Sequence, residues 1–250
     1  MLHNVEELKE LHIEVGYDET TTFGNYTIRV QNDDMAGDPR KEWDNLGTMV
    51  CWHSRYNLGD VDSGTYEDTM ALFYELSGLD IEADGWDFSD EQKERIYAAA
   101  FKKNVILPLY LYDHSGITMR TSSFSCQWDS GQVGWIYMSY EDIRKEYSWK
   151  RITKKRRALI EKYLTGEVET YDQYLTGDVY GFTITREDED GEEVVVDSCW
   201  GFYGYDDPYM TEDVIKGAIK YDIENTPAQM DLPFTQMPLE LESHNHQKAL

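Results

Sequence analysis

The alternation of apolar and polar positions is clearest in the middle of the chain. Two short apolar runs, Val105–Leu111 and Val133–Tyr137, are rich in aromatic and β-branched residues and are bounded by Gly and Ser. Runs of this kind are typical of strands. About twenty residues rich in Asp, His, Ser, Gly, Cys and Trp lie between them. A polar connection held by two rigid strands is a common place for chemistry or recognition.

Shorter patterns predict the elements on either side. Tyr26, Ile28 and Val30 alternate with polar residues, which predicts a half-buried strand over Asn25–Val30. The Ser-Asp-Glu-Gln run from Ser89 is an N-cap signature. The other expected elements are strands at Leu11–Val15 and Thr48–His53 and helices at Ser63–Ser77, Ser89–Asn104, Ser139–Tyr147, Thr153–Tyr174 (with Gly166 as an interruption and Gly177 as its end) and Thr211–Glu224.

The irregular order of these elements predicts the fold class. Val179–Thr185 and Val194–Trp200 flank Asp190-Gly191, a strong signal for an antiparallel hairpin. Strands and helices do not alternate strictly, so we expect an α+β fold with a mixed or antiparallel sheet, several flanking helices and a C-terminal hairpin plus helix. A single domain is expected over residues 1–225. Residues 226–250 hold three of the six prolines and no periodicity, which predicts a flexible tail.

The charge balance narrows the classes of partner. The chain has 49 acidic and 23 basic residues, for a formal net charge of −26. This charge argues against general affinity for nucleic acid, which depends on Lys and Arg neutralising phosphates. An acidic surface can instead bind a nucleic-acid-binding protein by presenting a similar field, or can simply provide solubility. The charged N-terminus is unlike a signal peptide, and no apolar run approaches a membrane span, so we expect a cytoplasmic protein without membrane contact.

The three cysteines indicate a reducing compartment and one candidate chemistry. Cys51, Cys126 and Cys199 are odd in number and form no CxxC pair. Each lies within two residues of a tryptophan. A thiolate nucleophile, with Cys199 as a candidate, would need His53 or His114 as its base. Buried cysteine packed beside aromatic rings is the alternative interpretation.

Imidazole and carboxylate groups in the central stretch suggest a divalent metal. His53, Asp60, Asp113 and His114 are of the ligand types that such an ion takes. No pair has HExxH or HxH spacing, so the fold would have to bring them together. In the alternative, Asp113 caps a turn and His114 makes only local contacts.

Strand geometry predicts which residues share a pocket. If the two apolar runs are antiparallel neighbours, Asp113 and Asp129 lie at the same end of the sheet. We then expect Asp113, His114, Asp129 and Gln132 to face one pocket, with His53 arriving from its own strand. The catalytic candidates are His53, Asp113, His114, Asp129 and Cys199, and the binding candidates are Asp129, Gln132, Asp172, Gln173 and Trp200.

A basic cluster stands out from the acidic background. Six of the 23 basic residues fall within eight positions: Lys150, Arg151, Lys154, Lys155, Arg156 and Arg157. Positive charge at the start of a helix opposes the helix macrodipole. The cluster therefore either pairs with the protein's own carboxylates or contacts nucleic acid or an acidic partner.

Five segments together carry a family resemblance. They are WDNLGTMVCWHSRYNLGD (43–60), VILPLYLYDHSGITM (105–119), WDSGQVGWIY (128–137), TYDQYLTGDVYGF (170–182) and DSCWGFYG (197–204). In this order they resemble a family of hypothetical proteins encoded in bacteriophage genomes and some mobile elements, over about residues 40–205. The resemblance implies a context, a phage accessory protein in the cytoplasm of an infected bacterium, and no mechanism.

Two functions of different class follow from these observations. The first is an acidic accessory protein that binds and antagonises or redirects a host bacterial protein, such as a defence or nucleic-acid-binding factor. The alternative is a small metal-assisted hydrolase that acts on a nucleotide or nucleic acid.

Overall fold

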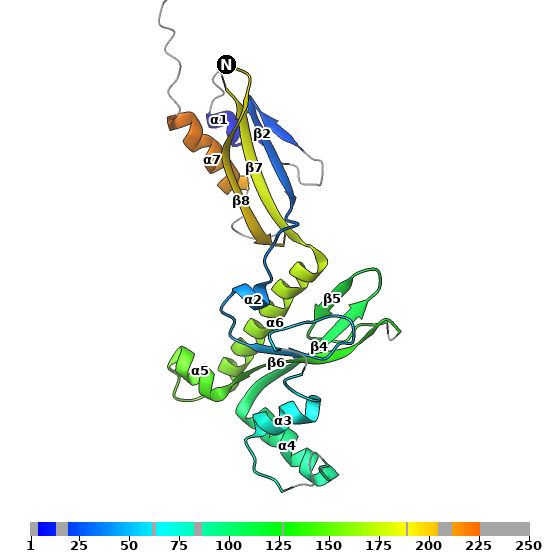
Figure 1. Ribbon diagram of the computed structural model, residues 1–250. Helices are drawn as coiled ribbons and strands as arrows, with labels where there is room; N and C mark the ends of the chain where they lie inside the picture. The colour runs from blue at the N-terminus through cyan, green and yellow to red at the C-terminus, as the bar shows by residue number, and fades with distance from the viewer. Residues whose placement is uncertain are drawn as a thin grey trace, which may run out of the picture.

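The protein folds around two separate antiparallel sheets, and the predicted α+β class is confirmed. The computed structural model describes residues 5–13, 20–61, 64–82, 87–126, 128–188, 190–204 and 212–225. The two sheets and their helices lie end to end, and helix α6 runs between them (Figure 1). We call them the terminal sheet and the central sheet, after the parts of the chain that form them.

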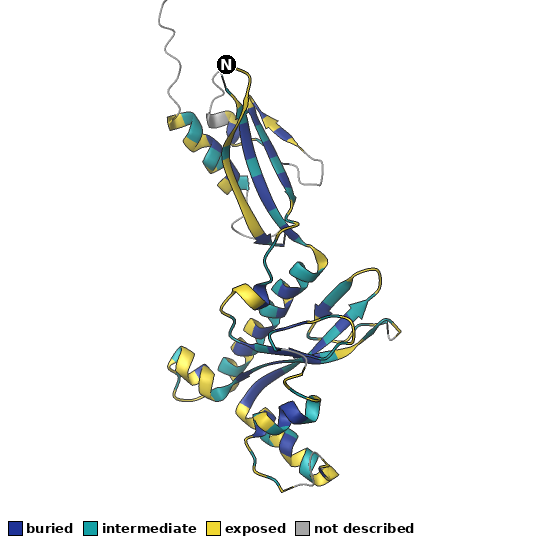
Figure 2. Ribbon diagram, viewed as in Figure 1, coloured by how far each residue is buried: buried dark blue, intermediate teal, exposed yellow. Residues whose placement is uncertain are grey.

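The terminal sheet combines strands from the N-terminal and C-terminal parts of the sequence. Its strand order is β1-β2-β7-β8, with every neighbouring pair antiparallel. Its core comes from Ile28, Val30, Phe182 and Ile184, on which Ile219 of α7 packs. Strand β8 is exposed along most of its length (Figure 2). The elements are α1 (Val5–Leu8), β1 (Thr21–Phe23), β2 (Tyr26–Asn32), β7 (Val179–Glu187), β8 (Glu193–Tyr203) and α7 (Glu212–Asn225).

The central sheet has the order β3-β6-β4-β5, again antiparallel throughout. Helix α6 covers one face, and α3 and α4 cover part of the other (Figure 1). Its elements are β3 (Thr48–Cys51), β4 (Asn104–Asp113), β5 (Ile117–Arg120) and β6 (Ser130–Ser139), with helices α2 (Pro39–Glu42), α3 (Thr69–Ser77), α4 (Asp90–Lys103), α5 (Tyr140–Tyr147) and α6 (Lys154–Thr176).

Helix α6 is amphipathic and its apolar stripe forms the main core. Ile160, Leu164, Val168 and Tyr171 recur at helical spacing and are buried against the sheet. Strand β3 can lie close to β6 because position 134 is glycine. A Cβ atom at Gly134 would lie 2.1 Å from the Val50 carbonyl oxygen.

Main-chain and aromatic contacts join the two sheets where α6 ends. Gly177 adopts the left-handed conformation there, with φ 72°, and its carbonyl accepts a 2.9 Å hydrogen bond from Asn32 Nδ2. The Trp43 and Tyr203 rings meet edge to face with centroids 4.7 Å apart. The Tyr203 hydroxyl also donates to the Gly37 carbonyl.

Most predicted elements are confirmed. The hairpin of β7 and β8, the helix N-cap at Ser89, and helix α5 after Ser139 all form. Helix α6 passes through Gly166 without interruption, because a single glycine costs only about 1 kcal/mol and the apolar stripe on either side of it packs on the sheet. The single-domain prediction stays a prediction. The expected tail at 226–250 and the Thr211 cap lie outside the described residues.

Three boundaries were wrong. Leu11–Ile13, the described part of the expected first strand, is not in a strand, although Ile13 is buried against the terminal sheet. Strand β3 ends at Cys51, so His53 lies in the loop beyond it. Helix α3 begins at Thr69 instead of Ser63, because Asp68 provides the cap by accepting a 2.9 Å hydrogen bond from the Ala71 amide.

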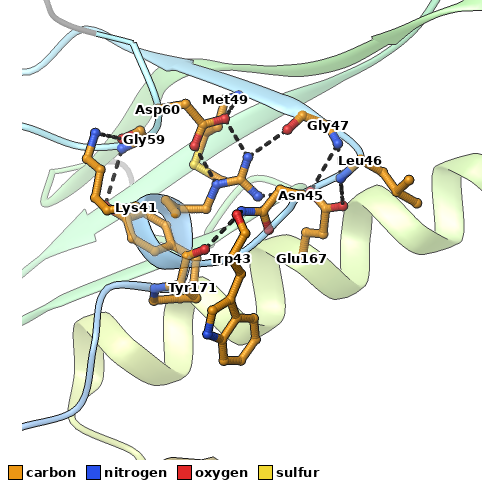
Figure 3. Close-up of polar contacts among 12 residues, drawn as sticks. Lys41, Trp43, Asn45, Leu46, Gly47, Met49, Gly59, Asp60, Glu167 and Tyr171 are labelled. Atoms are coloured by element: carbon orange, nitrogen blue, oxygen red, sulfur yellow. Dashed lines mark hydrogen bonds and ion pairs between the residues drawn. The ribbon is translucent and has the colours of Figure 1, made fainter. Parts of the chain in front are cut away.

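A buried arginine, Arg40, ties α2, the loop after β3 and α6 together. Figure 3 shows its two carboxylate partners, Asp60 and Glu167. The side chain of Arg40 is 1% exposed and donates to both oxygens of Asp60, at 2.7 and 2.5 Å, and to Glu167 Oε2 at 2.9 Å. Burial opposes its charge, but hydrogen bonds and charge from Asp60 and Glu167 outweigh burial and raise the pKa of Arg40. Main-chain groups complete the hydrogen bonding of these three side chains. The Gly47 carbonyl accepts from Arg40, the Met49 amide donates to Asp60, and the Leu46 amide donates to Glu167.

We expect Arg40→Met to lower the free energy of unfolding by about 3–5 kcal/mol, because two partly buried carboxylates lose the cation that they share. Urea denaturation measures the change. Arg29→Met is the matched control, since Arg29 pairs with Glu193 on the surface, and it should cost far less. Equal losses in the two variants would contradict a central role for Arg40.

Candidate functional site

The predicted convergence of two strand ends is present in the central sheet. Strands β4 and β6 are antiparallel neighbours, and the Asp113 amide donates a 2.8 Å hydrogen bond to the Asp129 carbonyl. The chain turns directly after Asp113: Ser115 has φ 58°, and the His114 amide donates to the Gly116 carbonyl at 3.0 Å. Asp113, His114 and Asp129 therefore lie at one corner of the sheet, as the strand argument required.

Ion pairs at this corner are largely open to solvent. Arg55, from the loop after β3, pairs with Asp113. His114 Nδ1 lies 3.5 Å from Asp129 Oδ2, and the His114 side chain is 63% exposed. The Cys126 sulfur lies 3.6 Å from the same carboxylate oxygen. Pairs this exposed contribute little to stability, so the corner is a polar surface and not an enclosed pocket.

His53 does not join this corner. Its Nδ1 accepts hydrogen bonds from the amides of Arg55 and Tyr56, at 3.3 and 3.2 Å, and its ring stacks on Tyr56 with centroids 4.9 Å apart. An Nδ1 that accepts in this way cannot carry the proton in the neutral imidazole. His53 therefore orders its own loop, and no contact to Asp113 or His114 forms within the described residues.

The four candidate metal ligands do not form a set. Arg40 occupies both oxygens of Asp60, and the Met49 amide takes a further position on one of them. Within the described ranges, no three His, Cys, Asp or Glu side chains lie close enough together to hold a metal ion. Asp60 is thus part of the structural network around Arg40.

The remaining candidates are distributed over both sheets. Asp172 Oδ1 accepts from Thr118 Oγ1 and the Met119 amide, at 2.7 and 2.6 Å, and so fastens β5 to α6. Gln173 lies at the junction, where a Cβ at Gly204 would be 2.3 Å from its amide nitrogen.

Two candidates belong to β8 of the terminal sheet. The Trp200 ring covers Gly181, where a Cβ would lie 2.1 Å from the ring. Cys199 is exposed on the same strand, whereas His53 and His114 belong to the central sheet. A Cys199–His pair therefore has no geometric support.

Gln132 lines a different feature, an open hollow of about 460 Å³. The hollow lies where β6 passes the loop after β3 and the start of α3. The Trp52 amide donates to the Val133 carbonyl at 2.7 Å, and the Trp52 indole nitrogen donates to the Tyr66 carbonyl at 3.0 Å. The lining residues are Trp52, Glu67, Asp68, Thr69, Gln132, Val133, Gly134 and Trp135. We call it the tryptophan hollow.

The lining of the tryptophan hollow favours a cation. Its lining includes two electron-rich indole side chains, and Glu67 and Asp68 add carboxylates on exposed positions. Trp135 is held in place by an edge-to-face contact with Phe73, with centroids 5.0 Å apart. Ammonium and guanidinium groups bind in settings of this kind, through cation–π attraction and charge.

Of this lining, only Gln132 stood among the residues predicted from the sequence. In the sequence Trp52 is simply the residue after Cys51, and Glu67 and Asp68 lie inside the helix expected over Ser63–Ser77. The available signal was Trp135, which alternates with the buried Ile136 along β6 and so faces away from the α6 core.

Comparisons with protein-family models, curated proteins and solved structures gave no significant match. Among the described helices, none combines the length and apolar character needed to cross a membrane.

Thiol reactivity should separate the cysteines. Burial, reinforced by the Asp60 charge, raises the pKa of Cys51 to about 12, so the folded protein holds this thiol neutral below that pH. We expect iodoacetamide to label exposed Cys199 in the native protein and Cys51 only after denaturation, as read by peptide mass spectrometry. Native labelling of Cys51 at the rate of Cys199 would contradict its burial.

Proposed function

We propose that this chain is a phage accessory protein that binds a basic host protein, and that the tryptophan hollow receives a Lys or Arg side chain of that partner. The observation that carries the proposal is the pairing of Trp52 and Trp135 with Glu67 and Asp68 in one hollow. The consequence of binding would be to antagonise or redirect the partner in the bacterial cytoplasm.

The net charge and the hollow supply different parts of recognition. A formal charge of −26 steers a basic protein towards the chain and is sensitive to salt. The hollow supplies local specificity, because a cation over an aromatic ring gains about 0.5–1 kcal/mol when exposed and about 2 when desolvated. One such contact is an anchor within a larger interface, so the partner must contact surrounding surface as well.

The class of partner follows from its required chemistry. Proteins that bind nucleic acid present clustered Lys and Arg side chains, which both the field and the hollow would recognise. The resemblance to phage-encoded proteins supports a bacterial host as the source. A host defence or nucleic-acid-binding factor meets both requirements. The hydrolase alternative lacks a cluster of three ligand side chains among the described residues, so geometry favours binding.

Charge reversal in the hollow should weaken capture of the partner. We expect immobilised wild-type protein to retain basic proteins from bacterial lysate, and Glu67→Lys to bind the recovered partner about tenfold more weakly, since a cation site has gained a cation. Mass spectrometry identifies the partner and titration gives its affinity. Because Glu67 is exposed and caps nothing, the melting temperature should be unchanged.

Glu169→Lys is the matched control, since it makes the same charge change at an exposed position on α6. Equal weakening by both variants would mean that net charge acts without the hollow. Failure to recover any reproducible partner, or binding unaffected by salt, would overturn the proposal itself.

A further inference from the structure

The charge of the chain reverses around the start of α6. Residues 144–157 hold eight basic side chains and one acidic side chain, Glu146, in a protein whose total formal charge is −26. They span the end of α5, the connecting loop and the first turn of α6. The local surface is therefore cationic although the protein as a whole is strongly anionic.

Three of these arginines have structural partners. Arg144 donates to the Tyr140 carbonyl at 3.2 Å. Arg157 donates to Glu161 and to the Tyr140 hydroxyl, both at 2.9 Å, and joins α6 to α5. Arg156 lies over the Trp149 ring at 4.7 Å and donates to the Arg151 carbonyl at 2.8 Å. These contacts hold the loop between α5 and α6 in place, and they do not engage the side chains of the neighbouring cations.

Four cations of the cluster have no carboxylate partner within the described residues: Lys150, Arg151, Lys154 and Lys155. All four are exposed. Self-pairing with the acidic surface therefore does not account for them. Lys154 and Lys155 also stand at the positive end of the α6 macrodipole, beside the Thr153 cap, where like charge is unfavourable. A polyanion would relieve this repulsion.

Stacked aromatic rings adjoin the four cations. Trp149 stacks on Tyr147 with centroids 4.6 Å apart, and Tyr147 lies parallel to Tyr163 at 6.4 Å. Arg156 lies over Trp149 at one end of this series of rings, and Tyr163, at the other end, is exposed. Proteins that bind single strands combine a cationic track for phosphates with an aromatic ring on which a base stacks.

We propose that this basic surface, formed by Lys150, Arg151, Lys154 and Lys155, binds single-stranded nucleic acid together with Tyr163, which lies about two turns further along α6. The cations contact phosphates, and the Tyr163 ring receives a base. The aromatic component favours nucleic acid over an acidic protein, which would need charge alone. The overall negative charge keeps the affinity local and strongly dependent on salt.

Fluorescence anisotropy with the full chain and labelled oligothymidylate or oligouridylate tests the proposal. Wild type should bind at low salt, and log affinity should fall linearly with log salt. In Lys154→Gln/Lys155→Gln the affinity should fall and the slope should shrink by about 1.4, since each phosphate contact on a single strand contributes about 0.7.

Lys93→Gln/Lys220→Gln is the matched control, because these lysines lie on α4 and α7 and the net charge change is the same. It should leave the slope unchanged. Tyr163→Ala should weaken binding without changing the slope, which separates stacking from charge. Circular dichroism confirms that each variant is folded.

Two results would overturn the proposal. One is equal binding by the Lys154/Lys155 variant and the control variant. The other is wild-type protein that binds neither oligonucleotide at low salt but does bind polyglutamate, which would assign the surface to an acidic protein. Neither result bears on Glu67 or the tryptophan hollow, so this proposal and the host-protein proposal fail separately.

Discussion

The buried charge of Arg40 is the constraint on which the central sheet depends. A guanidinium removed from water is tolerable only when its donors and the carboxylates beside it are all hydrogen-bonded. Asp60, Glu167 and the main chain near Gly47 meet that requirement together. The loop after β3 is thereby held at both ends: it starts from β3, and Asp60 at its other end is bound to Arg40. Trp52 and Arg55, carried on this loop, reach the tryptophan hollow and Asp113 for that reason.

The two proposed surfaces divide the electrostatics of one chain. The hollow is lined by carboxylates and indole side chains, which suit a cation, whereas the basic surface at the start of α6 suits an anion. If the host protein that this chain binds is itself attached to nucleic acid, that nucleic acid would lie close to this chain. Opposite charges held on separate elements would let one molecule contact both without neutralising itself.

Local chemistry was readable from the sequence, while long-range pairing was not. The cap at Ser89, the hairpin about Gly191 and the strand pair carrying Asp113 and Asp129 follow from short patterns, and the structure has them. The contacts of Arg40 could not be found this way. Its two carboxylates, Asp60 and Glu167, lie 20 and 127 residues away in the sequence and share no motif with it. The same applies to the hollow, because Trp52 comes from the loop after β3 and Trp135 from β6.

The order of the strands also bears on how the chain is made. Strand β2 pairs with β7, so Tyr26 cannot pair until Arg186 has been synthesised. All four strands of the central sheet and the helix that covers it, α6, are made before β7. The central sheet is in effect inserted into a hairpin-like loop of the terminal sheet. During synthesis from the N-terminus, β1 and β2 can pair with each other, but the other edge of β2 lacks its partner until β7 is made, so the terminal sheet, with its high contact order, closes last. Helix α6 ends at Gly177 and β7 begins at Val179, so the end of the helix fixes where the chain starts to pair with β2.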